Sequence, residues 1–252
     1  MSSFKSPHDS HQHSLYTLNW LYEYDEFMES IGTLIDMGCG DGLDLEWWAT
    51  RTTREDNPRP LNIKCLGVDQ IPQLAIAKQY PNIQYSCQDF DLPVALHKHT
   101  YDVLWCHDSF QYVIDPFKTL ANWWNLISDN GMAVIIVPQT TNIEFNVQAF
   151  VQPDLCYHHW TMVSLIHVLA VSGFDCSAGF FLKHPNDPWL HAIVYKSKHP
   201  PMDPKTTRWY DLADKGLLPK SAAESVNRRG FLSQPDLLLP WIDKSLMSFA
   251  QH

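Results

Sequence analysis

The sequence predicts an α/β protein built on a doubly wound, mostly parallel sheet. The stretch 33–42, TLIDMGCGDG, is a short apolar run that ends in an acid and is followed by glycine at every second position. An amphipathic segment comes next, so a strand, a tight turn and a helix are predicted in succession. Apolar runs at 62–69 and 132–138 provide further strands. The last of these is apolar throughout, as expected where helices cover both faces of a sheet.

Composition and charge narrow the class of protein. The chain has 252 residues, of which 45% are hydrophobic, enough for one full-sized core and an appendage. Its net charge of −10 predicts no nucleic-acid partner, because phosphates demand patches of Lys and Arg. Six cysteines without a C-x-x-C pair predict reduced, half-buried core residues of a cytoplasmic protein. With neither an apolar signal region nor a long apolar run, no membrane span is expected.

The N-terminal segment divides into a polar part and a helical part. Residues 1–13 are polar and contain His8, His11 and His13. Nothing nearby supplies the fixed geometry that a metal needs, so we interpret this part as a leader rather than a metal site. From Leu15 onward apolar residues recur at steps of three and four, which predicts an amphipathic helix.

The glycines at 38, 40 and 42 predict a loop that cradles a ligand. Glycine tolerates positive φ and lets a ligand lie against the backbone. The spacing is G-x-G-x-G, and not the G-x-G-x-x-G of a pyrophosphate-binding dinucleotide fold. Asp36 and Asp41 in this loop would repel a diphosphate but suit a cationic ligand. Both features disfavour a nicotinamide oxidoreductase on a similar fold.

The second strand, 62–69, also ends in an acid, Asp69. In doubly wound folds, an acid at this point accepts hydrogen bonds from ribose hydroxyls. Asp69 lies 33 residues beyond Asp36, and the charged, proline-containing loop at 51–60 accounts for that length. A helix is predicted at 72–79, with a proline in its first turn.

Two further strands are predicted before the middle of the chain. Residues 81–87 form a short one, and residues 101–107 form an apolar one that ends in a histidine. Asp115 and Pro116 then suit the N-cap and first position of a helix.

These motifs together resemble those of class I S-adenosylmethionine-dependent methyltransferases. The acid–Leu–Pro at 91–93, followed by YDVL at 101–104, is similar to the small-molecule enzymes related to ubiquinone biosynthesis. The resemblance covers 33–138. It implies a Rossmann-like, seven-stranded, mostly parallel sheet whose last two strands, 174–182 and 190–195, form a hairpin with the last strand antiparallel. It also implies an N-terminal lid helix, whose Tyr16, Trp20 and Tyr24 either line the cofactor or pack on the core.

The resemblance implies S-adenosyl-L-methionine as the cofactor. Asp69 would hold the ribose, and the acid and aromatic after the third strand would hold the adenine. The implied cofactor-binding residues are Asp36, Gly38, Cys39, Gly40, Gly42, Asp69, Gln70, Asp89, Phe90, His107 and Asp108.

Methyl transfer from a sulfonium is an in-line displacement, so the protein mainly aligns the reactants. A general base is needed only where the acceptor must lose a proton early. His107 is the first candidate, because the ordinary pKa of histidine lies near neutrality, although it could equally hold the methionine end of the cofactor. His158, beside His159, is the second candidate, and its alternative role is to contact backbone at the start of a helix.

The absence of several motifs narrows the class of methyl acceptor. Residues 107–110, HDSF, are not the Asn/Asp-Pro-Pro-aromatic set of enzymes that methylate exocyclic amines, and no Pro-Cys dipeptide supplies a cytosine-C5 nucleophile. No set of acids suggests a magnesium site. The sequence therefore favours metal-independent transfer to a small or medium-sized acceptor. The alternative function is a catalytically inactive, cofactor-binding scaffold.

We predict three parts along the chain. Residues 1–32 form a leader and cap helix, 33–197 the S-adenosylmethionine-binding domain, and 198–252 a linker and helical appendage that packs on the domain or on another copy of the chain. A polar lid or substrate loop is expected at 140–153.

Overall fold

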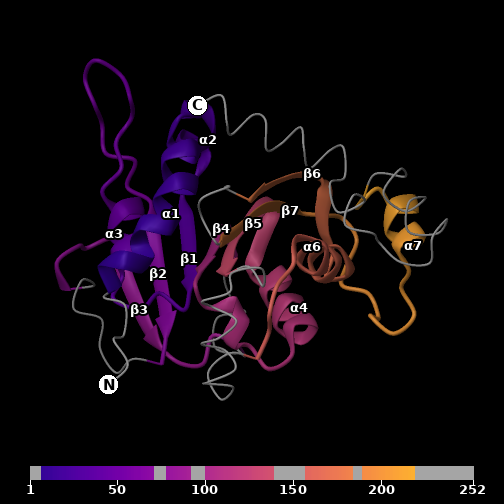
Figure 1. The fold of residues 1–252 in the computed structure, drawn as a ribbon. Coiled ribbons are helices and arrows are strands. Elements are labelled where there is room, and N and C mark those ends of the chain that lie inside the picture. The colour runs from indigo at the N-terminus through magenta and orange to yellow at the C-terminus, as the bar shows by residue number, and fades with distance from the viewer. Residues whose placement is uncertain (1–6, 71–77, 92–99, 139–156, 184–188, 219–252) are drawn as a thin grey trace.

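The computed structural model describes residues 7–70, 78–91, 100–138, 157–183 and 189–218 (Figure 1). The helix predicted at 72–79, the Leu–Pro at 92–93 and the loop predicted at 140–153 lie outside the described residues. The C-terminal appendage is described as far as residue 218.

The described helices and strands alternate along most of the chain. The helices are α1 (Pro7–Tyr22), α2 (Asp25–Ser30), α3 (Leu43–Ala49), the 3₁₀ helix η3 (Phe110–Tyr112), α4 (Pro116–Leu126), α6 (Met162–Val171) and α7 (Trp209–Asp214). The strands are β1 (Thr33–Met37), β2 (Lys64–Asp69), β3 (Ile83–Cys87), β4 (Tyr101–His107), β5 (Ile127–Pro138), β6 (Phe174–Lys183) and β7 (Trp189–Lys196).

All seven strands belong to one sheet, in the order β3-β2-β1-β4-β5-β7-β6. The pairs from β3 across to β5 are parallel, whereas β7 runs antiparallel to both β5 and β6. The predicted fold class is therefore confirmed, including the antiparallel last strand. Because β1, β2 and β4 are neighbouring parallel strands, the loops that follow them meet at one edge of the sheet, where ligands bind in open α/β folds.

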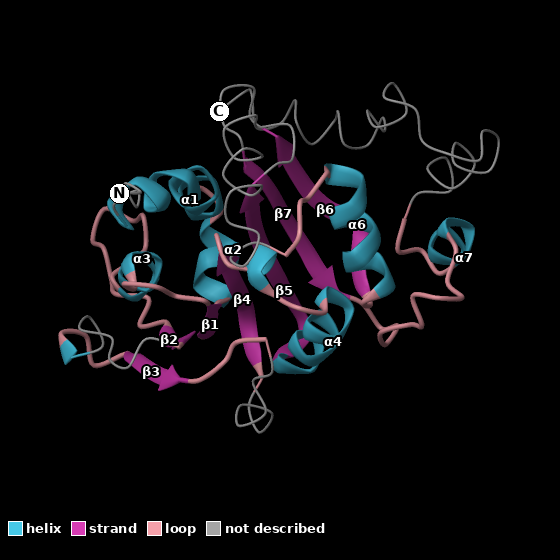
Figure 2. Ribbon diagram, turned by 60° about the horizontal axis from the view of Figure 1, so that its bottom comes forward, coloured by secondary structure: helices cyan, strands magenta, loops and turns pink. Residues whose placement is uncertain are grey.

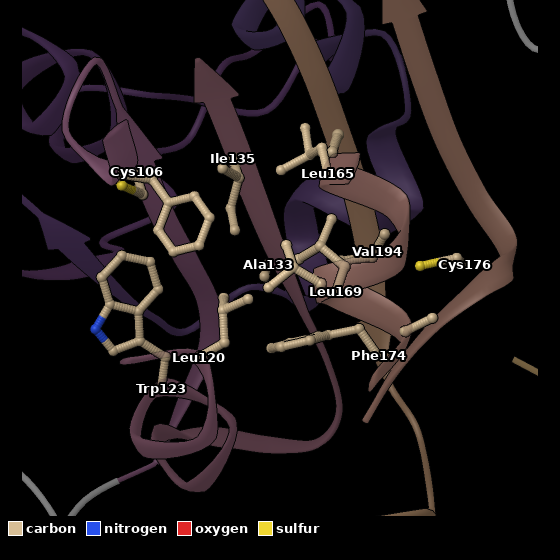
Figure 3. Packing of buried hydrophobic residues seen from close by; sticks show 14 of the residues in the cluster. Cys106, Leu120, Trp123, Ala133, Ile135, Leu165, Leu169, Phe174, Cys176 and Val194 are labelled. Carbon is tan, nitrogen blue, oxygen red and sulfur yellow. The ribbon is translucent and has the colours of Figure 1, made fainter. Parts of the chain in front are cut away.

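Helices cover both faces of this sheet, with α1 and α3 on one side and α4 and α6 on the other (Figure 2). The α4/α6 face joins alternate residues of β4, β5 and β7 to the apolar stripes of the two helices. Figure 3 shows Leu120 and Trp123 of α4 and Leu165 and Leu169 of α6 packed against β5. Leu212 of α7 belongs to the same buried cluster, and α7 lies beyond α6. The α1/α3 face holds a second cluster, in which Leu18 and Trp48 meet Trp105 of β4.

Local sequence explains where the helices of the α4/α6 face begin. The Asp115 side chain accepts a hydrogen bond from Lys118 N at 3.1 Å, and Pro116 occupies the first helical turn, as predicted. Thr161 and Ser164 form a capping box at the start of α6.

Helix α1 begins at Pro7, earlier than the Leu15 that the apolar spacing predicts. Polar side chains of this helix face the body of the protein, since Ser14 and Thr17 are both fully buried. Trp20 packs on Phe180, at 4.9 Å between ring centroids, and so is a core residue.

Strand β5 begins at Ile127, five residues before the predicted start at Met132. Ile127 pairs with Tyr101, but the next pair joins Val103 to Met132, so a bulge interrupts the ladder. Asn130 in this bulge has φ of 68°, which explains why the stretch resembles a turn that ends a helix.

Four of the five described cysteines are buried, at 39, 65, 106 and 176, in agreement with the prediction of core residues. Cys87 is exposed at the end of β3, because β3 is an edge strand. Within the described residues no helix combines the length and the apolar character needed to cross a membrane.

Candidate cofactor and acceptor site

The loop between β1 and α3 is held tightly against β2. The backbone N–H groups of Gly38 and Cys39 both donate to the Val68 carbonyl, at 2.8 and 3.2 Å. Gly38, Gly40 and Gly42 have φ of 79°, 52° and 85°, the left-handed region that the glycine spacing predicts. The loop is therefore a fixed, glycine-lined turn at the carboxyl edge of the sheet.

Gly38 and Gly40 differ in what surrounds them. A Cβ atom on Gly38 would lie 2.1 Å from Ser109 Oγ, so this glycine allows the loop after β1 to touch the loop after β4. A Cβ atom on Gly40 would meet no atom of the described residues within 4 Å. Packing of the protein itself thus requires the first glycine, whereas the second faces open space that a ligand can approach.

Asp69 fixes the tip of the glycine loop. Its Oδ2 accepts a hydrogen bond from Gly40 N at 2.9 Å, and its backbone carbonyl accepts one from the Tyr85 hydroxyl at 3.1 Å. The acid at the end of β2 and the loop after β1, predicted to share a ligand, are therefore in direct contact. Gln70, the next residue, is exposed.

Acidic side chains dominate the electrostatics of this edge. Asp36 is only 2% exposed, and burial, followed by the nearby charges of Asp44 and Asp69, raises its pKa well above the ordinary value. Burial and the same acidic field raise the pKa of the Cys39 thiol, which therefore stays protonated. Such a site favours a cation over a phosphate.

Phe90 lies against the glycine loop. Its ring would be 3.6 Å from a Cβ atom on Gly38, and its carbonyl accepts a hydrogen bond from Trp123 Nε1 at 2.9 Å. Asp89 is exposed, and its Oδ1 accepts from Asp91 N at 2.9 Å. The Phe90 ring thus lies beside the glycine loop, next in sequence to an exposed carboxylate, and their role at the adenine end of the ligand stays a prediction.

The end of β4 brings His107 and Asp108 to the same edge. His107 Nδ1 lies 3.1 Å from Asp44 Oδ2, and the side chain is only 8% exposed. Asp108 has φ of 53°, and its Oδ1 accepts from Gln111 Nε2 at 2.6 Å. This left-handed residue at the end of a strand turns the chain sharply into η3.

Asp44, on α3, is the site residue that the sequence interpretation missed. Its Oδ1 accepts from Ser14 Oγ at 2.6 Å, and its Oδ2 accepts from Trp105 Nε1 at 2.8 Å. His11 Nδ1 lies 2.5 Å from Oδ1. Burial raises the pKa of this carboxyl, but hydrogen bonds from His107, His11 and Ser14 outweigh it and hold the pKa well below the ordinary value.

A sequence signal for Asp44 existed. It precedes Trp47 and Trp48 by three and four residues, so an acid lies on the face of the helix that those two indoles share. An acid on an apolar helix face is unusual unless it has partners. Its partner His11 lies in the segment that we interpreted as a leader, and that interpretation is corrected: His11 belongs to α1 and contacts Asp44.

His158 lies beside the loop that follows β4. Tyr157 N and His158 N both donate to the Gln111 carbonyl, at 3.0 and 3.1 Å. The His158 ring is 5.5 Å from that of Trp160, which stacks on Phe110 at 5.0 Å between centroids. Its neighbour His159 is exposed. Within the described ranges, no group of three or more His, Cys, Asp or Glu side chains is placed to hold a metal ion.

Comparison with known proteins finds a matching family model and solved structures of similar fold. Residues 35–133 match the model of a methyltransferase domain family. No curated protein matches the chain significantly.

Solved structures share the fold at low sequence identity. The plantazolicin methyltransferase BpumL, in complex with SAH, is 16% identical with a TM-score of 0.56, and the match covers 77% of this chain and 92% of that one. A Haloferax volcanii protein in complex with the Trm112 methyltransferase activator is 14% identical with a TM-score of 0.57, over 75% and 92%. An O-methyltransferase family protein from Burkholderia thailandensis is 14% identical with a TM-score of 0.56, over 73% of this chain and 56% of that one.

Proposed function

We propose that this chain is a class I, S-adenosylmethionine-dependent methyltransferase that transfers the methyl group to a small or medium-sized acceptor without a metal ion. The single observation that carries this proposal is the contact between Gly40 N and Asp69 Oδ2 at an edge where Gly40 faces open space. It joins the loop after β1 to the acid after β2, the two parts to which we assign the nucleoside and the charged tail of the cofactor.

The chain's own residues fit S-adenosylmethionine along the length of that edge. The negative charges of Asp44 and Asp69 complement a sulfonium cation. Asp69 and exposed Gln70 offer hydrogen-bonding groups to the ribose. Phe90 offers an apolar face to the adenine, and Asp89 an acceptor for its amine. When bound, the cofactor supplies an electrophilic methyl group that needs no further activation.

We assign the base to His107. An ionised carboxylate only accepts hydrogen bonds, so the His107 nitrogen that faces Asp44, Nδ1, carries a hydrogen. In the neutral ring the lone pair then resides on Nε2, which can take a proton from the acceptor. His158 remains the second candidate, because its backbone is tied to η3, directly after the strand that carries His107.

The acceptor side of the site is aromatic. Tyr112 of η3 and Tyr157 are 41% and 54% exposed, and their near neighbours in the chain, Phe110 and Trp160, stack on each other in the core. Exposed rings held on a rigid base suit an apolar or aromatic acceptor, which they can stack against.

Methyl transfer can be tested without knowing the acceptor. Purified protein is incubated with a small-molecule extract and S-adenosylmethionine bearing a trideuterated methyl group, and mass spectrometry follows products that carry the label. We expect a labelled product and stoichiometric S-adenosylhomocysteine with the wild type, and neither with His107→Ala. Cofactor binding without any labelled product, across extracts, would instead identify the inactive scaffold.

A further inference from the structure

We propose that Asp44 is a positioning residue through which the N-terminal helix α1 completes the active site, by sharing its carboxylate between α1 and His107. This inference rests on the proposed methyl transfer, in which His107 is the base. It gives α1 a specific part in the reaction beyond covering the sheet.

The two oxygens of Asp44 serve different elements. Oδ1 contacts α1, through Ser14 Oγ at 2.6 Å and His11 Nδ1 at 2.5 Å. Oδ2 contacts β4, through Trp105 Nε1 at 2.8 Å and His107 Nδ1 at 3.1 Å. One buried carboxylate therefore ties the N-terminal helix to the strand end that carries the base.

This arrangement fixes both the position and the hydrogen placement of His107. Four donors converge on a carboxylate whose side chain is 9% exposed, so its two oxygens have little freedom to move. Trp105 Nε1 holds Oδ2 from one side, and that same oxygen defines where the His107 ring must point. A carboxylate that orients a histidine and selects its tautomer is what a histidine base requires.

A ring contact links α1 to His107 by a second path. His13 of α1 stacks on Trp189 at 4.9 Å between centroids, and Trp189 lies 5.6 Å from the His107 ring. The docked helix thus confines His107 from the carboxylate side and from the indole side. Removal of the α1 contacts to Asp44 should let the carboxylate, and with it His107, reorient.

The structure also provides a matched control on the same helix. Thr17, one turn beyond Ser14, has its Oγ1 2.9 Å from Nδ1 of His191 on β7. Both hydroxyls are fully buried and both tie α1 to the body of the protein. Only Ser14 contacts Asp44, so the pair separates helix docking in general from the effect on the carboxylate.

The test compares Asp44→Asn, Ser14→Ala and Thr17→Val. An asparagine has a single acceptor oxygen and cannot receive all four donors. For Asp44→Asn we expect turnover to fall about 10- to 100-fold, part of the full contribution of a base, with KM for S-adenosylmethionine within a few-fold of wild type. Ser14→Ala should lower turnover by a smaller factor, and Thr17→Val should leave it unchanged.

The tautomer of His107 provides a readout that needs no turnover. In ¹⁵N spectra of the S-adenosylhomocysteine complex, assigned with His107→Ala, the wild type should show hydrogen on Nδ1, and Asp44→Asn should lose that signature. Wild-type turnover and an unchanged tautomer in Asp44→Asn would overturn the proposal. Equal losses of turnover in Ser14→Ala and Thr17→Val would also overturn it, because helix docking alone would then explain both.

The same spectra separate this proposal from the proposed function. If the wild type transfers no methyl group but the tautomer changes in Asp44→Asn and in Ser14→Ala, the positioning by Asp44 stands and the assigned reaction fails. If turnover is present and the tautomer is insensitive to both variants, the reaction stands and the positioning fails.

Discussion

The two faces of the sheet bury different chemistry. On the α4/α6 face, apolar side chains such as Leu169, Phe174 and Ile135 interlock (Figure 3). On the α1/α3 face, the buried side chains include Asp36, Asp44 and His191, the buried aspartates and histidine of the described residues. The α4/α6 face is thus held by apolar packing, whereas the α1/α3 face combines apolar packing with buried ionisable groups where the site lies.

The largest expected effect on stability comes from a substitution in the apolar core of the α4/α6 face. Phe174 is fully buried among α6, β5 and β7, so Phe174→Ala should lower the free energy of unfolding by about 3–5 kcal/mol. Denaturant titration measures the loss. S-adenosylhomocysteine affinity of the folded variant, measured by calorimetry below its transition, should stay at the wild-type value, and a parallel loss of affinity would show that the two faces are not separate in function.

A substitution on the α1/α3 side of the sheet should instead lower cofactor affinity. Asp69→Ala removes the acceptor of Gly40 N and the proposed partner of the ribose, and should weaken S-adenosylmethionine binding by about 1–3 kcal/mol. Calorimetric titration of the folded variant gives the number. Unaltered affinity would remove Asp69 from the site.

The buried acid Asp36 predicts a pH dependence. Its pKa is raised by burial and by Asp44 and Asp69, so the folded protein holds this proton more tightly than the unfolded chain does. The free energy of unfolding should therefore fall as pH rises from the unfolded value near 3.8 to the raised folded value, and stay level above it. Asp36→Asn should abolish this fall and be more stable than the wild type at neutral pH, because the neutral amide carries no charge that burial would penalise.

Urea titrations of both proteins between pH 4 and 8 check this prediction. Asp44 contributes in the opposite sense at low pH, because its pKa is held down, but both proteins contain Asp44 and its contribution cancels in their difference. A difference that is constant across the range would contradict a raised pKa at Asp36.

The smallest expected effect comes from loss of the hydrogen bond between α1 and β7. Thr17→Val keeps the shape of the side chain but removes the hydroxyl that meets His191 Nδ1, and should cost about 1 kcal/mol of unfolding free energy. Thermal unfolding measures it. A loss as large as that of Phe174→Ala would mean that buried hydrogen bonds, and not apolar packing, contribute most of the stability of the α1/α3 face.

Much of the fold follows from local pattern, and the site follows only in part. The strand ends at Asp69 and His107 and the helix start at Pro116 are fixed by signals within a few residues, and the sequence predicts them. The Asp44 cluster joins residues more than 60 positions apart, from His107 to Asp44, and about 30 apart, from Ser14 to Asp44. No local spacing encodes such contacts, so the interpretation of residues 1–13 as a leader missed the contact between His11 and Asp44.

The bulge in β5 is a second feature that depends on a contact distant in sequence, and local pattern does not predict it. Asn130 and Gly131 have the sequence of a turn, and a Cβ on Gly131 would lie 2.9 Å from the Asp102 carbonyl. The glycine thus permits close approach of β4, a reason that only the neighbouring strand reveals.

The central claim, that the open space at Gly40 belongs to S-adenosylmethionine, is tested most directly by calorimetric titration of S-adenosylhomocysteine into Gly40→Val and Gly216→Val. Both glycines have positive φ, 52° and 75°, so the two variants share a backbone strain of about 1–2 kcal/mol. At both positions a Cβ would meet no atom of the described part of the chain within 4 Å. Only Gly40 touches Asp69. We predict that Gly216→Val binds as the wild type does and that Gly40→Val, still folded, shows no detectable binding; wild-type affinity in Gly40→Val would contradict the account.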